Sequence, residues 1–244
     1  MEKVIALEAT NVSKVFNITE DSQNTVKHRL FNFFSPLKAK RIEAVKNVDL
    51  EVHKGECVGL IGRNGCGKST LIRLLAGVYP VDSGHVRING TTLLMHLGLG
   101  MSQQLTAREN IFVSASILGL SIRDTDKIFD QIIDFAELRE FVDTKIKFFS
   151  SGMVARLGFS IAVNTGADIM FLDEIFSVGD VKFQEKAVAV FESNWIKGKT
   201  VILVSHSMDV VRKYCTRAAF MKQGNVEYFG DPTRAIELYM ADNQ

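Results

Sequence analysis

The stretch that decides the fold reads Gly62-Arg63-Asn64-Gly65-Cys66-Gly67-Lys68-Ser69-Thr70. The apolar run 57–61 in front of it predicts a buried strand, and the apolar residues of 71–75 behind it predict a helix. Glycines at this spacing let the backbone curl until successive N–H groups point at one anion. The first turn of the helix aims its free N–H groups and the positive end of its dipole at the same place. The stretch therefore predicts a loop that holds the phosphates of a nucleoside triphosphate.

Two side chains of this loop add chemistry of their own. The ammonium of Lys68 places a full positive charge on the β and γ phosphates, and the hydroxyl of Ser69 can bind Mg²⁺. An ordinary turn explains this context poorly, because a strand precedes the loop and a helix follows it. All residues from Gly62 to Thr70 are therefore candidate nucleotide ligands.

The composition narrows the class of protein. With 244 residues, the chain suits one large α/β domain, or a core with a smaller inserted subdomain. Apolar residues make up 46%, which excludes wholesale disorder, and the formal charge of +1 shows no overall bias toward nucleic acid. Cys57, Cys66 and Cys215 lack metal-ligand spacing and indicate reduced thiols in a cytosolic protein. No apolar run approaches ~20 residues, so we expect a chain that is not secreted and does not span a membrane, although it can lie against a membrane partner.

Patterned segments elsewhere predict an α/β frame with a helical insertion. Residues 107–142 carry helical periodicity, with a helix start just after Ser121. The apolar runs 169–172 and 201–204 are bounded by polar residues, which favours central strands of a parallel sheet. The dipeptide Asn89-Gly90 predicts a hairpin turn. Further strands are expected at 4–9, 11–16, 48–53, 86–88, 218–221 and 226–229, and a last helix from Pro232.

The stretch 17–41 leaves two interpretations open. It begins polar and then gathers Phe31, Phe33 and Phe34 among basic residues. A solvated loop anchored by a few aromatic rings explains this pattern, and so does a surface that contacts anionic lipid head groups or a membrane subunit. Phe16, just before the stretch, suits a core aromatic by its position, with stacking on adenine as the alternative.

Polar side chains follow the two predicted central strands directly. Asp173 and Glu174 come directly after the run 169–172. His206 follows Ser205, which comes directly after the run 201–204. Because the carboxyl ends of parallel strands border the ligand crevice, these side chains can lie beside the phosphates. Asp173 then suits the Mg²⁺ shell, Glu174 suits polarising the attacking water, and His206 suits a contact with the γ-phosphate.

A second helix start follows Phe149. Ser150, Ser151 and Gly152 precede a helical stretch, which makes them an N-cap and also a second place where a helix end can bind an anion. The residues alone leave open where this second helix end points.

Four motifs in this order resemble those of the ATP-binding subunit of an ABC transporter. They are the loop 62–69, the segment 150–153, Leu172-Asp173-Glu174 and Ser205-His206. The resemblance covers nearly the whole chain. It implies an α/β fold in which a P-loop NTPase (RecA-like) core carries an antiparallel β subdomain and an α-helical subdomain inserted at about 101–160. Residues 1–244 are then expected to form a single nucleotide-binding domain that binds ATP and Mg²⁺ and hydrolyses ATP.

The same resemblance implies a dimer of two copies arranged head to tail. The segment 150–152 of one copy then contacts the ATP held by the loop of the other copy, and Phe16 becomes the aromatic residue that stacks on adenine. The remaining roles that it implies are catalysis by Glu174, His206 and Lys68, and Mg²⁺ binding by Ser69 and Asp173.

Three stretches resemble one branch of this family, the ATPases of polysaccharide exporters. They are the segments 105–111, 150–153 and Ser177-Val178-Gly179-Asp180. This implies export of a lipid-linked O-antigen, capsular polysaccharide or teichoic acid through a separate polytopic permease. The chain is then peripheral, on the cytoplasmic face of the inner membrane. Because it stops at Gln244, soon after its last helix, we expect a member without the C-terminal carbohydrate-binding domain that some relatives carry.

The chain also departs from the general family pattern. Phe149, Ser151 and Met153 replace three residues of the usual Leu-Ser-Gly-Gly-Gln signature, and the export branch shares the last two changes. The Gln that usually precedes the helical subdomain is missing, since its place falls near His96 or Leu97.

Two other functions stay open at this point. One is a transporter ATPase for another substrate, such as a lipid or a drug. The other is a soluble ABC-type ATPase that acts on nucleic acid, but such proteins usually carry two ATPase halves, whereas this chain has one phosphate loop and no basic excess. We therefore expect no nucleic-acid partner.

Overall fold

The computed structural model describes residues 4–19, 39–95, 101–173, 181–192 and 198–243. The strands are β1 (Ile5–Thr19), β2 (Ala39–His53), β3 (Cys57–Ile61), β4 (Ser83–Ile88), β5 (Thr92–Met95), β6 (Ile169–Asp173), β7 (Thr200–Val204), β8 (Arg217–Lys222) and β9 (Asn225–Gly230). The helices are α2 (Lys68–Leu75), α3 (Ala107–Ile117), α4 (Ile122–Ala136), α5 (Ser151–Thr165), α6 (Val181–Glu192), α7 (Met208–Tyr214) and α8 (Pro232–Asp242). None of the helices in these ranges is long and apolar enough to span a bilayer.

The larger sheet has six strands in the order β5-β6-β7-β3-β8-β9. Its first five strands run parallel, and β9 returns antiparallel to β8. Every residue of β3, β6 and β7 is buried, as expected for strands that are covered on both faces. The predicted central strands are therefore confirmed. Because β6, β7 and β3 are parallel neighbours, their carboxyl ends meet at one edge of the sheet.

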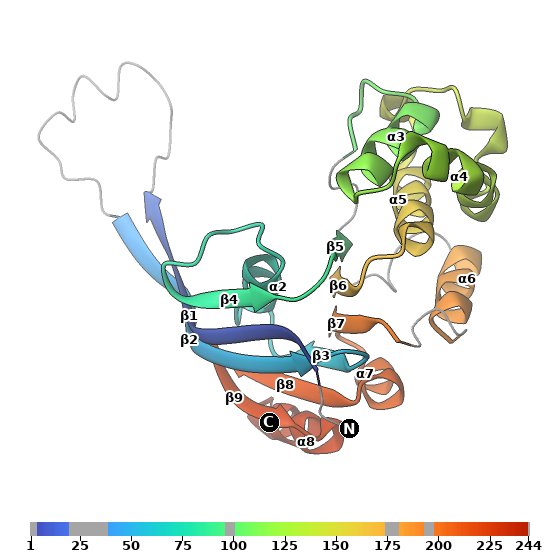
Figure 1. Cartoon of the computed structure of the whole chain (residues 1–244). Helices are drawn as coiled ribbons and strands as arrows, with labels where there is room; N and C mark the ends of the chain where they lie inside the picture. The colour runs from blue at the N-terminus through green and yellow to red at the C-terminus, as the bar shows by residue number, and fades with distance from the viewer. Residues whose placement is uncertain (1–3, 20–38, 96–100, 174–180, 193–197, 244) are drawn as a thin grey trace, which may run out of the picture.

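The smaller sheet is antiparallel and has the order β2-β1-β4. The strand segments expected at 4–9 and 11–16 form one continuous strand, β1, which passes through Asn11 at φ 51° with a register shift against β2. Helix α2 lies between the two sheets (Figure 1). Leu7 of β1 and Leu50 of β2 join Leu71 of α2 and Phe171 of β6 in one buried cluster, so the phosphate-loop helix is held by both sheets.

The predicted hairpin at Asn89-Gly90 is wrong. Strand β4, before this dipeptide, pairs with β1, whereas β5, after it, pairs with β6 in the other sheet. The side-chain amide of Asn89 donates to the carbonyl of Ile5 at 3.0 Å, and the amide of Thr91 donates to the Asp168 carboxylate at 2.8 Å. These contacts direct the chain from one sheet to the other, so the dipeptide is a crossover and not a hairpin turn.

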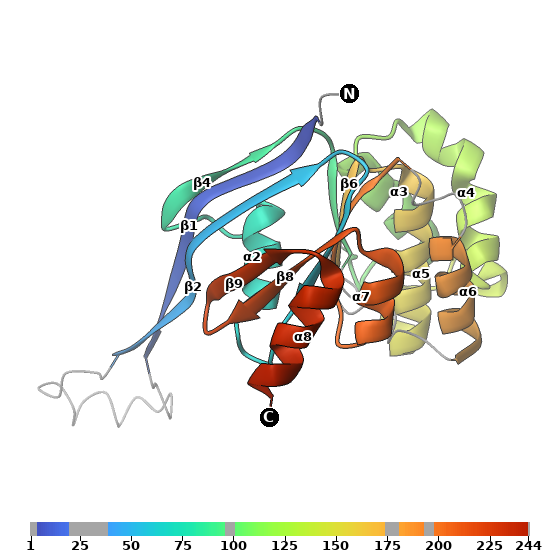
Figure 2. The same cartoon turned by 90° about the horizontal axis from the view of Figure 1, so that it is seen from below.

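Helices α3, α4 and α5 form a separate group at one side of the molecule (Figures 1 and 2). Their shared core contains the fully buried Ile111, Ile132 and Leu157. The predicted start of α4 is confirmed, because the Ser121 hydroxyl accepts a hydrogen bond from the amide of Asp124. Helix α5 also reaches the main body, where Phe159 packs in the cluster of β6 and β7. The helical group is thus attached to the sheet through α5.

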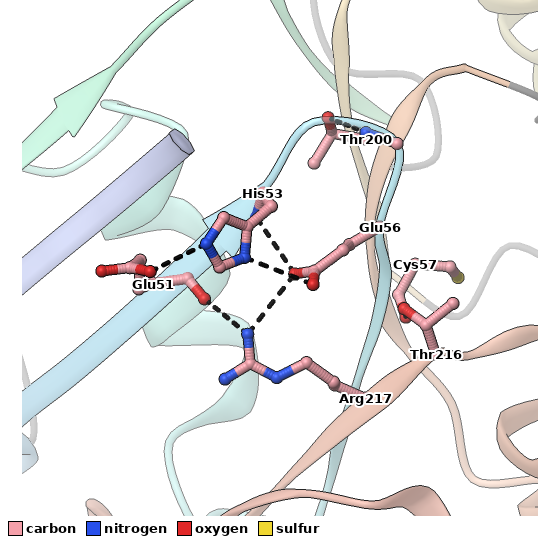
Figure 3. A network of polar contacts seen from close by, with 8 residues as sticks. Glu51, His53, Glu56, Cys57, Thr200, Thr216 and Arg217 are labelled. Carbon is pink, nitrogen blue, oxygen red and sulfur yellow. Dashed lines mark hydrogen bonds and ion pairs between the residues drawn. The ribbon is translucent and has the colours of Figure 1, made fainter. Parts of the chain in front are cut away.

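A polar network fixes the amino end of β3, opposite the phosphate loop (Figure 3). The Arg217 guanidinium donates to the carbonyl of Glu51 at 2.9 Å and to the Glu56 carboxylate at 3.4 Å. The same carboxylate accepts from the amide of His53 at 3.0 Å, and the amide of Gly55 donates to the hydroxyl of Thr200 at 3.2 Å. These bonds tie the end of β2 to β7 and β8, so both ends of β3 are held.

Candidate functional site

A cavity of about 680 Å³ opens at the carboxyl end of β3. Its walls come from the phosphate loop, from β2, from the turn between β8 and β9, and from the residue that follows β7. The residues that line it are Ile42, Glu43, Ala44, Lys46, Asn64, Gly65, Cys66, Gly67, Lys68, Ser69, Thr70, His206, Gln223 and Gly224. Most of the predicted nucleotide ligands and His206 are therefore brought together around one space.

Two glycines give the phosphate loop its shape. Gly67 has φ 111°, and a Cβ atom there would lie 2.2 Å from the carbonyl oxygen of Ala44 in β2. Gly62 has φ 151°, and a Cβ atom there would lie 2.3 Å from the carbonyl oxygen of Met221 in β8. The loop is therefore pressed against two strands at points where a side chain has no room.

The amino end of α2 is open toward the cavity. Its N-cap is Gly67 in the left-handed conformation, so no side chain caps the first turn, and that turn contains no acidic residue. The first N–H groups of a helix have no partners within the helix and attract anions. This helix end is therefore suited to a phosphate.

Lys68 is a buried cation in the wall of this cavity. Its side chain is 6% exposed, and Nζ donates to the carbonyl oxygens of Gly62 at 2.7 Å and Arg63 at 3.0 Å. These bonds use two of the three ammonium donors and hold the third in a defined direction. Gly62 and Arg63 do not line the cavity, although their carbonyl oxygens hold Lys68, and their contact with ATP stays a prediction. Because a buried positive charge is costly without a compensating anion, this site favours a polyanionic ligand.

Cys66 lines the same cavity and is buried. Burial raises the pKa of its thiol, although the nearby charge of Lys68 opposes that effect. The thiol therefore stays protonated near neutral pH and adds no negative charge to the cavity wall.

The acidic pair is only partly described. Asp173 is buried at the end of β6 and lies beside Val204 of β7 in the sheet. Glu174, the stretch 177–180 and the position near His96 lie outside the described residues. His206 is exposed, just beyond the end of β7, and lines the cavity. Since β7 stands between β6 and β3, the Asp173 carboxylate and the phosphate loop occupy the same edge of the sheet.

The residues present fit a Mg²⁺ ion. Ser69 lines the cavity, and Asp173 is the last residue of β6, the strand two places from β3. Mg²⁺ prefers oxygen ligands and is commonly bound by one or two carboxylates together with substrate phosphates. A hydroxyl, a carboxylate and a triphosphate provide that set of donors.

The amino end of α5 takes no part in this chain's own cavity. Ser150 caps α5, with its hydroxyl accepting from the amide of Met153 at 3.2 Å. Ser150 and Ser151 are exposed, and neither they nor Gly152 line the cavity. Their contact with a nucleotide held by a second copy stays a prediction.

Phe16 lies on β1, where its ring meets Tyr79 edge-on with centroids 6.0 Å apart. It is not among the residues that line the cavity, although its partner in the β1–β2 ladder, Ile42, is. Its stacking on adenine stays a prediction. Sequence reasoning missed the wall formed by β2, even though alternation along that strand places Ile42 and Ala44 on one face.

The turn between β8 and β9 was expected as a turn but not as part of the site. Gln223 has φ 49° and Gly224 has φ 88°. The amide of Gly224 donates to the carbonyl of Cys66 at 2.9 Å, and its carbonyl accepts from the amide of Lys46 at 2.9 Å. The turn thereby links the phosphate loop to β2. No local sequence pattern predicts this connection.

Known proteins are similar to this chain in sequence and in fold. Residues 45–177 match the family described as ABC transporter. The chain is 38% identical over 243 residues to the O-antigen export system ATP-binding protein RfbB of Klebsiella pneumoniae, covering 98% of both proteins. It is 38% identical over 241 residues to the teichoic acids export ATP-binding protein TagH of Enterococcus faecalis, covering 99% of this chain but 54% of that protein. The dimeric structure of the ATP-binding cassette MJ0796, in a post-hydrolysis state with ADP and Pi, has a TM-score of 0.74 at 23% identity and covers 93% of this chain and 98% of that one.

The likeness to the solved cassette confirms the expected fold, with its core sheet, antiparallel sheet and helical group. The family match spans more than half of the chain, from within β2 to beyond β6, and it includes the phosphate loop and Asp173. Together with relatives that align over almost the full chain, this establishes the relationship. The chain belongs to the ABC transporter family and is one of its ATP-binding subunits.

Proposed function

We propose that this chain is the ATP-hydrolysing subunit of an ABC transporter that exports a cell-surface polysaccharide. The observation that carries the proposal is the buried ammonium of Lys68 beside an uncapped helix end, in a cavity that also contains Ser69 and His206. Such a cavity suits a triphosphate and suits few neutral ligands.

Each residue of the site is proposed to have its own role in ATP binding or hydrolysis. The loop amides and Lys68 hold the triphosphate, and Lys68 stabilises negative charge that develops on the transferred phosphoryl group. Glu174 polarises the attacking water, and an N–H of His206 donates to a γ-phosphate oxygen. Ser69 and Asp173 would hold Mg²⁺, which when bound supplies positive charge to the phosphate oxygens.

Two copies of the chain are proposed to share each site. The amino end of α5, with Ser150, Ser151 and Gly152, does not line the cavity of its own chain. It would instead close on the nucleotide that the second copy holds. Closure on two ATP molecules would drive a polytopic permease, and hydrolysis would reset it. The dimeric state of the related cassette MJ0796 supports this arrangement.

The proposed substrate is a lipid-linked polysaccharide, carried across the inner membrane with this chain peripheral on the cytoplasmic face. Support comes from RfbB, which is named for O-antigen export, and which this chain matches along 98% of its length. A second candidate is teichoic acid, because TagH is equally identical over nearly the whole of this chain.

The enzymatic part is tested with purified protein and radiolabelled ATP. Lys68→Ala should lower hydrolysis about 100-fold or more, because the charge that binds the phosphates is lost. Glu174→Gln should retain ATP and accumulate closed dimers. Lys127→Ala, which removes an exposed cation on α4, is the matched control and should leave hydrolysis unchanged. Equal hydrolysis in all four proteins would remove Lys68 and Glu174 from their roles.

The shared site is tested by mixing two inactive variants. Ser150→Arg blocks the end of α5, and Lys68→Ala disables the phosphate loop. A mixed dimer keeps one site with both parts intact, so partial hydrolysis should return. A mixture that stays inactive at every ratio would argue that each chain holds a self-contained site.

The transport part is tested in cells that lack this chain. If it energises polysaccharide export, lipid-linked glycan should accumulate inside the membrane, and a permease encoded beside the chain should co-purify with it. Accumulation of teichoic acid instead would select the second candidate. Normal export of both polymers would refute the transport proposal while leaving ATP hydrolysis intact.

A further inference from the structure

An exposed aromatic ring stands just before the capped end of α5. Phe148 is 71% exposed and ends the short 3₁₀ turn Ile146–Phe148, two residues before Ser150. The next residue, Phe149, turns the other way and packs edge-on against Phe141, with centroids 6.3 Å apart. Of two adjacent phenylalanines, one is therefore used inside the helical group and the other faces outward.

The turn that carries Phe148 is firmly held. Ile146 is 4% exposed, and its amide donates to the carbonyl of Leu105 at 3.0 Å. The amide of Lys147 donates to the carbonyl of Gln103 at 3.1 Å, and the amide of Phe148 donates to the carbonyl of Lys145 at 3.0 Å. The backbone of Phe148 is thus held in place while its ring is exposed, which leaves that ring available for a contact that the isolated chain does not make.

We propose that Phe148 packs on a second copy of this chain, over the open end of its nucleotide cavity and against Ile42. This inference rests on the proposed shared site, because Phe148 lies two residues before Ser150, the N-cap of α5. It adds a contact beyond the phosphates: Ser150 would face the phosphate loop, and Phe148 would cover the part of the cavity that β2 forms.

The lining of the cavity offers an apolar counterpart. Ala44 lies against Gly67 of the phosphate loop, and Ile42 lies two residues further along β2, about 6–7 Å away at the rise of a strand. Ile42 is 37% exposed, so a large part of its side chain is available.

The charges next to these residues are also complementary. The ammonium of Lys147 lies 4.9 Å from the centre of the Phe148 ring, and Glu43 stands beside Ile42 in the cavity wall. The Glu43 carboxylate is 3.7 Å from Arg41, an exposed contact that a second cation can join. A second copy is therefore the occupant that both the apolar and the charged groups favour.

The test compares dimer formation in the Glu174→Gln background, where ATP is retained. Phe148→Ala is set against Ile117→Ala, because Ile117 on α3 is also 71% exposed in the same helical group. Analytical ultracentrifugation with ATP should show about tenfold weaker dimerisation for Phe148→Ala and no change for Ile117→Ala. Binding of a fluorescent ATP analogue to the monomer should be equal in both.

Two results would overturn the inference in distinguishable ways. If the parent dimerises with ATP and both variants match it, Phe148 makes no such contact and the shared site stands. If the parent never dimerises with ATP, the shared site fails and this contact fails with it. A second measurement mixes Phe148→Cys with Ile42→Cys chains: an ATP-dependent disulfide between them supports the contact, and its absence under mild oxidation contradicts it.

Discussion

Replacing Gly67 with alanine should separate the shape of the phosphate loop from its chemistry. The new Cβ atom would lie 2.2 Å from the carbonyl oxygen of Ala44, whereas real Cβ atoms essentially never approach closer than 3.0 Å. The loop and β2 must therefore move apart by at least 0.8 Å, the difference between these two distances. Overpacking of this kind costs about 1–3 kcal/mol.

Gly65→Ala is the matched control. Gly65 also has a positive φ, 78°, but a Cβ atom there would meet nothing within 4 Å. Both variants place an alanine at positive φ, which costs about 1–2 kcal/mol and is partly offset by the lower entropy of the unfolded chain. Only Gly67→Ala adds a collision with β2.

The assay is unfolding of the nucleotide-free proteins, by urea and by heat. For a chain of this size, 1 kcal/mol shifts Tm by about 2–4 °C. Gly67→Ala should thus melt about 2–12 °C below Gly65→Ala. Equal melting temperatures would refute the argument, because they would show that the loop is not pressed against β2.

Three further predictions concern other parts of the molecule. Burial alone raises the pKa of Glu56, but the bond from the His53 amide and the charge of Arg217 bring it below its ordinary value. The ionised Glu56 carboxylate therefore stabilises the folded protein fully above the ordinary carboxyl pKa. This contribution is lost as the pH falls to the lowered pKa of the folded protein. Glu56→Gln should cost about 1–3 kcal/mol in urea unfolding at pH 7 and less at pH 4, and a cost independent of pH would contradict this. Thr106→Ala removes the capping box with Glu109 and should lower the stability of α3 by about 0.5–2 kcal/mol. Amide exchange in the first turn of α3 should become faster, and unchanged exchange would contradict the cap. The hydrogen bond from Cys57 and burial raise the pKa of the Cys215 thiol, so it should react with a disulfide reagent only after unfolding, and rapid reaction of the folded protein would contradict this burial.

Sequence patterns predicted features whose physical cause is local. The phosphate loop follows from glycine spacing between an apolar run and a helix, and the start of α4 follows from the hydroxyl of Ser121 three residues before an amide it can cap. The central strands β6 and β7 were predictable because strands covered on both faces consist almost entirely of apolar residues.

The same reasoning failed where a feature depends on pairing between distant segments. Asn89-Gly90 has the composition of a hairpin turn, yet β4 and β5 find their partners in different sheets. Composition describes which backbone angles a dipeptide tolerates and not which strand its neighbours join.

The amino-acid sequence by itself predicted a loop suited to a triphosphate, since the loop, its lysine and its helix are contiguous. Tertiary structure alone decided what surrounds that loop: Ile42 and Ala44 come from β2, His206 from the end of β7, and Gln223 from a turn near the carboxyl terminus. The reason is physical, because a loop's conformation is set by its own residues, whereas a cavity exists only where separate strands are packed against that loop.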